Sequence, residues 1–124
     1  MHTDIQLFNT LKYRIVKDEY STRYYNKHNQ LHREDGPAVI LPTGSEFWYY
    51  NGLRHRENGP AIVWSDGYSE WIQTGQRHRI GGPAVEYPDG TKRWFLYGKL
   101  CSRAEYHKQL KLLGIEYGCW CRTV

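Results

Sequence analysis

The sequence predicts an all-β protein in which 23-residue β-hairpin repeats stack into an open curved sheet or solenoid, followed by a C-terminal capping helix. Three observations lead to this prediction. One set of landmark residues occurs three times at a constant spacing, each copy contains two strand-forming runs joined by a turn signal, and the pattern stops at a stretch with helix signals. A constant period of this length is typical of arrays in which each copy is one supersecondary unit.

The landmarks follow the same order in every copy. Each copy starts with His-Arg, continues with Gly-Pro-Ala, a turn glycine and a tryptophan, and ends at a second glycine. They are His32-Arg33, His55-Arg56 and His78-Arg79; Gly36-Pro37-Ala38, Gly59-Pro60-Ala61 and Gly82-Pro83-Ala84; Gly44, Gly67 and Gly90; Trp48, Trp71 and Trp94; and Gly52, Gly75 and Gly98. We therefore predict one domain over residues 1–124, with an N-terminal cap at 1–31, three repeats at 32–99, and a helix and tail at 100–124.

The second copy illustrates the hairpin. Residues 60–64 form an apolar, β-branched run that begins at a proline, which is tolerated at the first position of a strand. A turn signal at 65–67 leads to an aromatic run at 70–72, and two such runs joined by Asp-Gly predict a hairpin. Alternation assigns Ile62 and Trp64 to one face and Ala61 to the other. We expect the tryptophan of each copy to fill the core between hairpins.

Both ends of the array are predicted to be atypical, because a terminal copy has a neighbour on one side only. Residues 13–31 are interpreted as a degenerate copy, with residues 15–16 aligned to 38–39 and Tyr25 aligned to Trp48. After Gly98 the pattern ends. Ser102 and Glu105 have capping-box spacing, so a helix is expected over 104–113, with Gly114 as its stop and an apolar stripe that covers the last copy.

Composition limits the class of protein. The mean hydropathy is −0.78, but aromatic residues make up 15% of the chain, so a folded protein is expected. The formal charge is +4, yet residues 32–99 contain 8 basic and 8 acidic residues, which argues against a long basic groove for nucleic acid. No signal-like or membrane-length apolar run is present, and we expect a cytoplasmic protein that does not bind membranes.

The cysteines and the absence of catalytic motifs narrow the function further. The chain has an odd number of cysteines, Cys101, Cys119 and Cys121, so reduced thiols are expected in place of a disulfide framework. A Cys-x-Cys motif without a second cysteine pair predicts no metal site. The sequence contains no phosphate-binding glycine loop, nucleophile elbow or paired Cys-His signature. It therefore predicts a protein that is not an enzyme and has no cofactor.

Residues 48–55 and 59–67 carry a resemblance to a known repeat. These residues resemble MORN repeats in the order of an aromatic residue, an Asn-Gly turn, a histidine, a glycine and an Asp-Gly turn. They are also similar to the His-Arg-Glu-Asp-Gly-Pro-Ala repeats of uncharacterised bacterial and phage proteins. The MORN resemblance implies stacked hairpins that act as platforms for proteins or lipids. It implies no catalytic residues.

Two sets of residues are candidate binding sites. Tyrosine is favoured at protein interfaces, and arginine offers charge-assisted contacts, which predicts a partner surface at Tyr49, Tyr50, Tyr68, Tyr97, Arg54 and Arg77. The His-Arg ladder could instead bind an anion through His32, Arg33, His55, Arg56, His78 and Arg79. The alternative for the ladder is structural, with each histidine bonded to a neighbouring carbonyl and the arginines paired with Glu34, Asp35 or Glu57. We favour the structural interpretation, since a repeat consensus is first a packing consensus.

The expected function is binding of a protein, by a small inhibitor or adaptor that presents one face of its sheet. The similarity to phage repeats implies an inhibitor of a host defence or nuclease protein. One alternative is binding of a nucleotide or nucleic acid along the His-Arg ladder. The second is a structural protein that self-assembles through its sheet edges, as a homodimer or larger oligomer.

Overall fold

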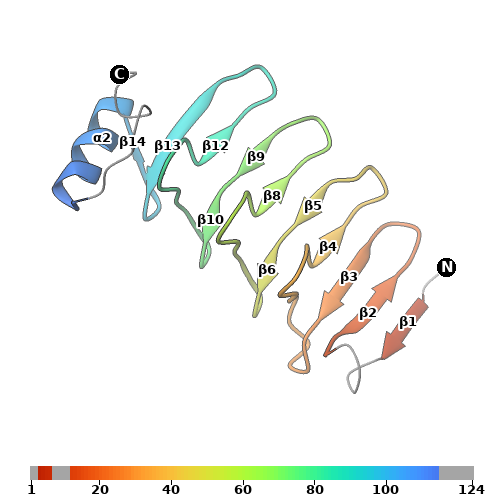
Figure 1. Ribbon diagram of the computed structural model, residues 1–124. Helices are drawn as coiled ribbons and strands as arrows, with labels where there is room; N and C mark the ends of the chain where they lie inside the picture. Colours follow the sequence, from red (N-terminus) through yellow and green to blue (C-terminus); the bar gives the residue numbers. More distant parts are fainter. Residues whose placement is uncertain (1–2, 7–11, 115–124) are drawn as a thin grey trace.

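The computed structural model describes residues 3–6 and 12–114, with only the backbone described at 3–6. Within these residues one antiparallel sheet dominates, and the chain enters its strands in sequence order (Figure 1). The main sheet contains β1 (Thr3–Gln6), β2 (Arg14–Lys17), β3 (Thr22–Tyr25), β4 (Val39–Ile40), β5 (Glu46–Phe47), β8 (Ile62–Val63), β9 (Ser69–Glu70), β12 (Val85–Glu86), β13 (Lys92–Leu96) and β14 (Lys99–Cys101). The predicted all-β class is confirmed, and the sheet is open rather than closed.

Two small hairpins extend from one side of the main sheet. They are formed by β6 (Tyr49–Tyr50) with β7 (Leu53–Arg54) and by β10 (Ile72–Gln73) with β11 (Gln76–Arg77). The strand runs are short because Trp48 and Trp71 interrupt them, whereas β13 continues through Trp94. Figure 1 shows these hairpins at the lower side of the sheet and the turns that join β4 to β5, β8 to β9 and β12 to β13 at the opposite side.

One row of residues connects the copies through the sheet register. Val39 pairs with Phe47, Phe47 pairs with Ile62, and Ile62 pairs with Glu70. The N-terminal cap joins the same row, since Val16 pairs with Arg23 and Arg23 pairs with Val39. The alignment of residues 15–16 with 38–39 therefore agrees with the strand register.

The alignment of Tyr25 with Trp48 is wrong by one residue. The N–H of Tyr24 donates to the carbonyl of Ala38, as the N–H of Trp48 donates to the carbonyl of Ala61. The β2–β3 turn is one residue shorter than the β4–β5 turn, because Val16 pairs with Arg23 seven positions on whereas Val39 pairs with Phe47 eight positions on. Tyr24 thus takes the place of the tryptophan.

The most buried positions are small. Ala38, Ala61 and Ala84 are 0% exposed, and each donates its N–H to the strand that follows. Ile62, Ile72, Val85 and Phe95 complete the apolar strip. The prediction that the tryptophans fill the core needs correction: Trp48, Trp71 and Trp94 are half-buried and pack against the edge of the buried clusters.

The hairpin tips adopt left-handed backbone. Asn51, Thr74 and Tyr97 have φ of 48°, 48° and 50°, and the glycine that follows each of them also has positive φ. Two consecutive residues with positive φ are the signature of a type I′ turn, which matches the twist of the flanking strands. Asn-Gly suits this turn, but a β-branched residue such as Thr74 is rarely found in left-handed backbone.

The helix α2 (Arg103–Leu112) covers the end of the array beside β13 and β14 (Figure 1). Ser102 accepts a hydrogen bond from the N–H of Glu105, and Glu105 accepts one from the N–H of Ser102, so the predicted capping box is confirmed. Gly114 follows the C-cap with a φ of 74°. Leu113, predicted on the buried stripe, is exposed instead, because the helix ends before it.

Tyr106 anchors this helix to the third copy. Its ring is 0% exposed, and its hydroxyl donates to the carbonyl of Arg79 while accepting from the N–H of Gly81 at 3.0 Å. The N–H of Gly82 also points at this hydroxyl, at 3.4 Å. The tail from 115 onward, with Cys119 and Cys121, lies outside the described residues. No helix in the described part of the chain has the length and apolar character to cross a bilayer.

Candidate protein-interaction surface

The ladder histidines hold the hairpin tips. The Nδ1 atoms of His32, His55 and His78 accept the backbone N–H of Asn51, Thr74 and Tyr97, respectively, at 2.8, 2.9 and 2.9 Å. Each donor is the first left-handed residue of a type I′ turn, 19 positions further along the chain. The imidazoles must be unprotonated at Nδ1 to accept these bonds. The histidines therefore hold the hairpin tip of their own copy, and they accept backbone N–H groups where the structural interpretation expected bonds to carbonyls.

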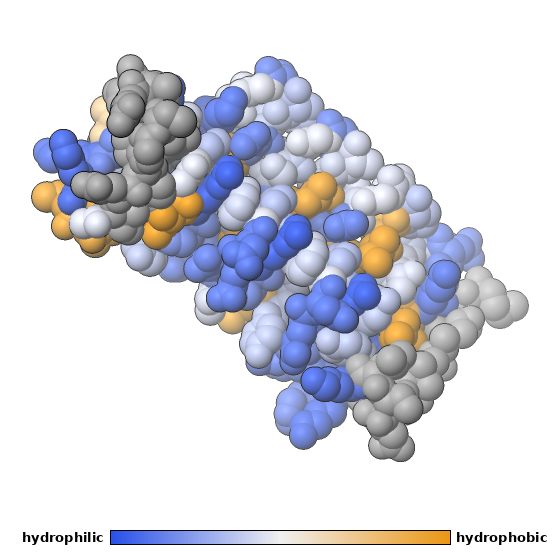
Figure 2. All heavy atoms as spheres, viewed as in Figure 1, coloured by the Kyte–Doolittle hydropathy of each residue, from blue (hydrophilic) through white to orange (hydrophobic). Residues whose placement is uncertain are grey.

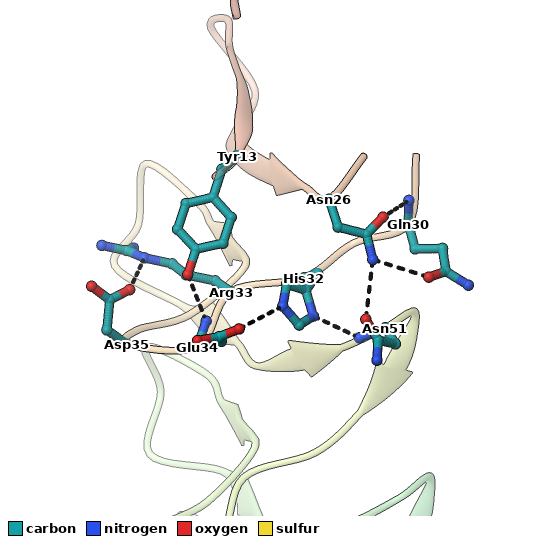
Figure 3. A network of polar contacts seen from close by, with 8 residues as sticks. All are labelled: Tyr13, Asn26, Gln30, His32, Arg33, Glu34, Asp35 and Asn51. Carbon is teal, nitrogen blue, oxygen red and sulfur yellow. Dashed lines mark hydrogen bonds and ion pairs between the residues drawn. The ribbon is translucent and has the colours of Figure 1, made fainter. Parts of the chain in front are cut away.

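His32 shows the surroundings of one such link (Figure 3). Its Nε2 lies 3.6 Å from a carboxylate oxygen of Glu34, on the side of the ring opposite to Asn51. Asn26 donates through its side-chain nitrogen to the side-chain oxygen of Asn51 at 3.1 Å. The hydroxyl of Tyr13 accepts the N–H of Glu34 at 3.0 Å. This network occupies the polar groups around the first ladder histidine.

Each ladder arginine joins two neighbouring copies, because it packs on the aromatic ring of the preceding copy, or of the N-terminal cap for Arg33, and donates to a carbonyl of its own copy. The guanidinium carbon of Arg56 lies 3.8 Å from the centre of the Trp48 ring, and Nη1 donates to the carbonyl of Pro60 at 3.1 Å. Arg33 makes the same two contacts with Tyr24 and Pro37, and Arg79 makes them with Trp71 and Pro83.

The glycine of Gly-Pro-Ala makes room for this arginine. A Cβ atom at Gly59 would come within 2.6 Å of the Arg56 guanidinium carbon, and the equivalent glycines, Gly36 and Gly82, would give 2.7 and 2.8 Å. A side chain cannot occupy that space unless the guanidinium moves away. The consensus thus describes one packing unit, in which arginine is held between an aromatic ring and a glycine.

The groove beside the ladder is electrostatically mixed. It lies between the first and second copies and has a volume of about 590 Å³. The lining residues are Arg33, Glu34, Asp35, Trp48, Tyr50, His55, Arg56, Glu57 and Asn58. Asp35 pairs with Arg33 at 3.3 Å, and burial lowers the pKa of Arg56 while Glu46 acts in the opposite direction. Three carboxylates against two guanidiniums make this groove a poor match for an anion. Anion binding by the six ladder residues stays a prediction.

The opposite side of the sheet is aromatic. We define the aromatic face by the residues Phe47, Tyr49, Arg54, Trp64, Tyr68, Arg77, Tyr87 and Arg93. Two pairs of rings pack edge to plane on this face. The ring centroids are 5.0 Å apart between Phe47 and Trp64 and 5.2 Å apart between Tyr68 and Tyr87. Trp64 remains 42% exposed and Tyr87 39% exposed, so both rings are available to a partner. Half-buried aromatic rings are typical of interaction surfaces.

Register places these side chains on one face. Phe47, Glu70 and Arg93 belong to the row of directly paired residues. Trp64 and Tyr68 lie two positions from members of that row, and side chains two apart in a strand point the same way. The ladder arginines lie on the other side of the sheet. Arg56 contacts Trp48 and Arg79 contacts Glu86, and these two residues point away from their neighbours in the strands, Phe47 and Val85. Figure 2 shows hydrophilic clusters alternating with smaller hydrophobic spots along one side of the sheet.

Tyr68, Glu70 and Arg77 form a connected group on the aromatic face. Tyr68 donates its hydroxyl to Glu70 at 2.8 Å, and Nε of Arg77 donates to the other carboxylate oxygen at 2.7 Å. Burial, followed by the hydrogen bond to Glu70, raises the pKa of Tyr68 to about 12. The same carboxylate raises the pKa of Arg77. Tyr68 is half-buried, and its hydroxyl satisfies a buried carboxylate.

The six predicted partner residues divide between two places. Tyr68 and Arg77 lie on the aromatic face, and Arg54 joins Tyr49 there through an Nε–hydroxyl contact of 3.4 Å. Tyr50 and Tyr97 lie elsewhere, against the rings of His32 and His78, with centroid distances of 4.6 and 4.2 Å. They are 46% and 62% exposed at the hairpin tips.

Sequence reasoning missed the central rings of this face as binding residues. Phe47, Trp64 and Tyr87 were assigned to strands, and alternation placed Trp64 and Tyr87 on a common face. One signal could have identified them as binding residues: in a single-layer sheet, large aromatic side chains on an outer face are not covered by a second layer. Among the described residues no group of three or more His, Cys, Asp or Glu side chains could hold a metal ion.

No known family model matches this chain, and no curated protein or solved structure matches it. A functional assignment must therefore come from its own geometry.

Proposed function

We propose that this protein is a non-enzymatic protein-binding module of the adaptor or inhibitor type, and that its partner docks on the aromatic face. The observation that carries the proposal is the pair of half-exposed rings, Trp64 and Tyr87, on one side of the sheet. Aromatic rings bury large areas at low entropic cost, which is why they dominate the energetics of protein interfaces. The rings rest on Phe47 and Tyr68, so they are already oriented before a partner arrives.

The proposal includes the stacked character of the copies. The same histidine, arginine and glycine contacts recur in all three copies, which supports a MORN-like array of hairpin units that acts as a platform. Such an array presents a rigid, extended surface and needs no catalytic group. The ladder residues hold the array together in this proposal, and the aromatic face contacts the partner.

Affinity capture from a lysate of the organism that encodes the chain tests this function. The double variant Trp64→Ser with Tyr87→Ser should recover at least about tenfold less of each specific partner, since central aromatic residues often contribute 2 kcal/mol or more. The matched control is Leu112→Ser, which removes another exposed apolar side chain, on α2. Thermal melting should show that both proteins remain folded. Equal recovery by the double variant and the wild type would contradict a role for this face.

A further inference from the structure

The two sides of the sheet differ in charge balance. On the aromatic face, Arg77 is paired with Glu70, which is only 8% exposed and is also bonded to Tyr68. Arg54 and Arg93 are exposed, and no described carboxylate comes within ion-pair distance of either guanidinium. Asp89 interacts electrostatically with Arg93 from beyond ion-pair distance, so among the described residues this face carries two guanidiniums that no carboxylate contacts directly.

The ladder side is balanced in comparison. Arg33 pairs with Asp35 at 3.3 Å, and Arg79 pairs with Glu86 at 3.6 Å. Arg56 is influenced by the carboxylate of Glu46. Because the repeats contain equal numbers of basic and acidic residues, a charge excess on one side reflects how the side chains are distributed and not the composition.

We infer that the partner presents an acidic protein segment, rich in Asp or Glu, to the aromatic face, an inference that rests on the proposed function. Arg54 offers its guanidinium beside the Tyr49 hydroxyl, and the Arg93 guanidinium lies 5.9 Å from the centre of the Tyr87 ring. A guanidinium matches a carboxylate with two parallel hydrogen bonds, and neighbouring rings exclude water from such a pair. The exposed rings of Trp64 and Tyr87 then cover the aliphatic parts of the acidic side chains.

A nucleic acid fits this face less well. Stacking of bases needs open ring planes in succession, but Tyr68 and Tyr87 meet edge to plane, as do Phe47 and Trp64. Arg93 additionally covers part of Tyr87. Two guanidiniums form no continuous track for a phosphate backbone, on which nucleic-acid affinity mainly depends. An acidic protein segment needs only local carboxylates.

Fluorescence anisotropy with defined probes tests the inference. The probes are a labelled random copolymer of Glu and Tyr and a labelled oligothymidylate, each titrated with the full chain at about 50 mM and about 200 mM salt. The copolymer should bind at least about tenfold more tightly than the oligothymidylate, and Arg54→Gln with Arg93→Gln should weaken it by about tenfold or more. The control is Lys108→Gln with Lys111→Gln, which removes the same charge from α2 and should change affinity less than about twofold.

The outcomes separate this inference from the proposed function. Tighter binding of the oligothymidylate, no measurable binding of the copolymer, or equal losses in the two double variants would overturn the acidic-segment inference. Arg54→Gln with Arg93→Gln is also used in the lysate capture described above. If the ring variant loses the partner and the arginine variant retains it, the protein-binding function stands and the acidic segment is rejected. If neither variant loses the partner, the function itself is rejected.

Discussion

Gly59 offers a direct test of how the ladder arginine is packed. Alanine at this position would place its Cβ within 2.6 Å of the Arg56 guanidinium carbon. Gly59 does not have positive φ, so the backbone itself accepts alanine. We therefore expect Gly59→Ala to act on the guanidinium alone, which must leave the Trp48 ring and the carbonyl of Pro60.

The magnitude follows from the two contacts that are lost. The hydrogen bond from the charged guanidinium to the Pro60 carbonyl contributes about 1.5–3 kcal/mol, and the cation–π contact with Trp48 about 0.5–2 kcal/mol. Partial exposure of both groups favours the lower ends of these ranges. Alanine also restricts the unfolded chain, which stabilises the protein by about 0.4–1 kcal/mol. The net expectation is a loss of about 1–3 kcal/mol in the free energy of unfolding.

Urea denaturation of a double-mutant cycle measures this coupling. Arg56→Ala removes the guanidinium, so Gly59→Ala in that background should be neutral or slightly stabilising. Asn58→Ala, at the neighbouring exposed position, serves as the control and should stay within about 0.5 kcal/mol of wild type. Equal destabilisation by Gly59→Ala with and without Arg56 would refute the packing argument.

Three further predictions concern the hairpin tips and the contact between the helix and the third copy. Thr74→Asn should raise the free energy of unfolding by about 1 kcal/mol in urea melts, because Thr74 occupies left-handed backbone at a position that favours asparagine; an unchanged or lowered midpoint would contradict this. Tyr106→Phe should cost about 1–3 kcal/mol by thermal or urea unfolding, since it leaves the N–H of Gly81 without its acceptor, and a wild-type transition would show that the hydroxyl is dispensable. Burial lowers the pKa of His78 from 6.5, so the unfolded chain binds that proton more readily; the stability contributed by neutral His78 is complete above about pH 6.5 and is lost as the pH falls through the lowered pKa of the folded state. Urea midpoints from about pH 8 to pH 5 should fall in wild type and fall less in His78→Gln, and parallel curves would exclude this histidine as the cause.

The period and the hairpins were predictable because each is encoded within one copy. Strand runs, the Asp-Gly turn and the capping box are local signals, and the structure contains all of them. The position of Tyr24 was not predictable from spacing alone. A turn shortened by one residue shifts the whole second strand of the cap, and the constant period conceals such a deletion.

The burial of the tryptophans was predicted wrongly for a physical reason. A single layer of short strands has no second layer to cover an indole ring, so the fully buried positions go to Ala38, Ala61 and Ala84. The indoles of Trp48 and Trp71 are covered instead by a flexible arginine from the following copy. The contact between arginine and indole can be recognised in the sequence only when the glycine of Gly-Pro-Ala is known to leave space for the guanidinium.

The candidate site was predictable in part. Tyr49, Arg54 and Arg77 were named from residue type, and they do lie on the aromatic face. Tyr50 and Tyr97 were named on the same grounds but pack against the histidine that begins their own copy. Residue type alone cannot separate these cases, because the contacts join positions 18 to 19 residues apart.

The histidine links have a consequence for how such a chain can change its length. Each imidazole bonds to the hairpin tip of its own copy, so removal of residues 55–77 would take away His55 together with the turn that it holds at Thr74. The links from His32 to Asn51 and from His78 to Tyr97 would remain. Gene duplication or deletion in steps of 23 codons therefore keeps each histidine together with the turn that it holds, and selection can lengthen or shorten the sheet while the remaining hairpin tips stay bonded.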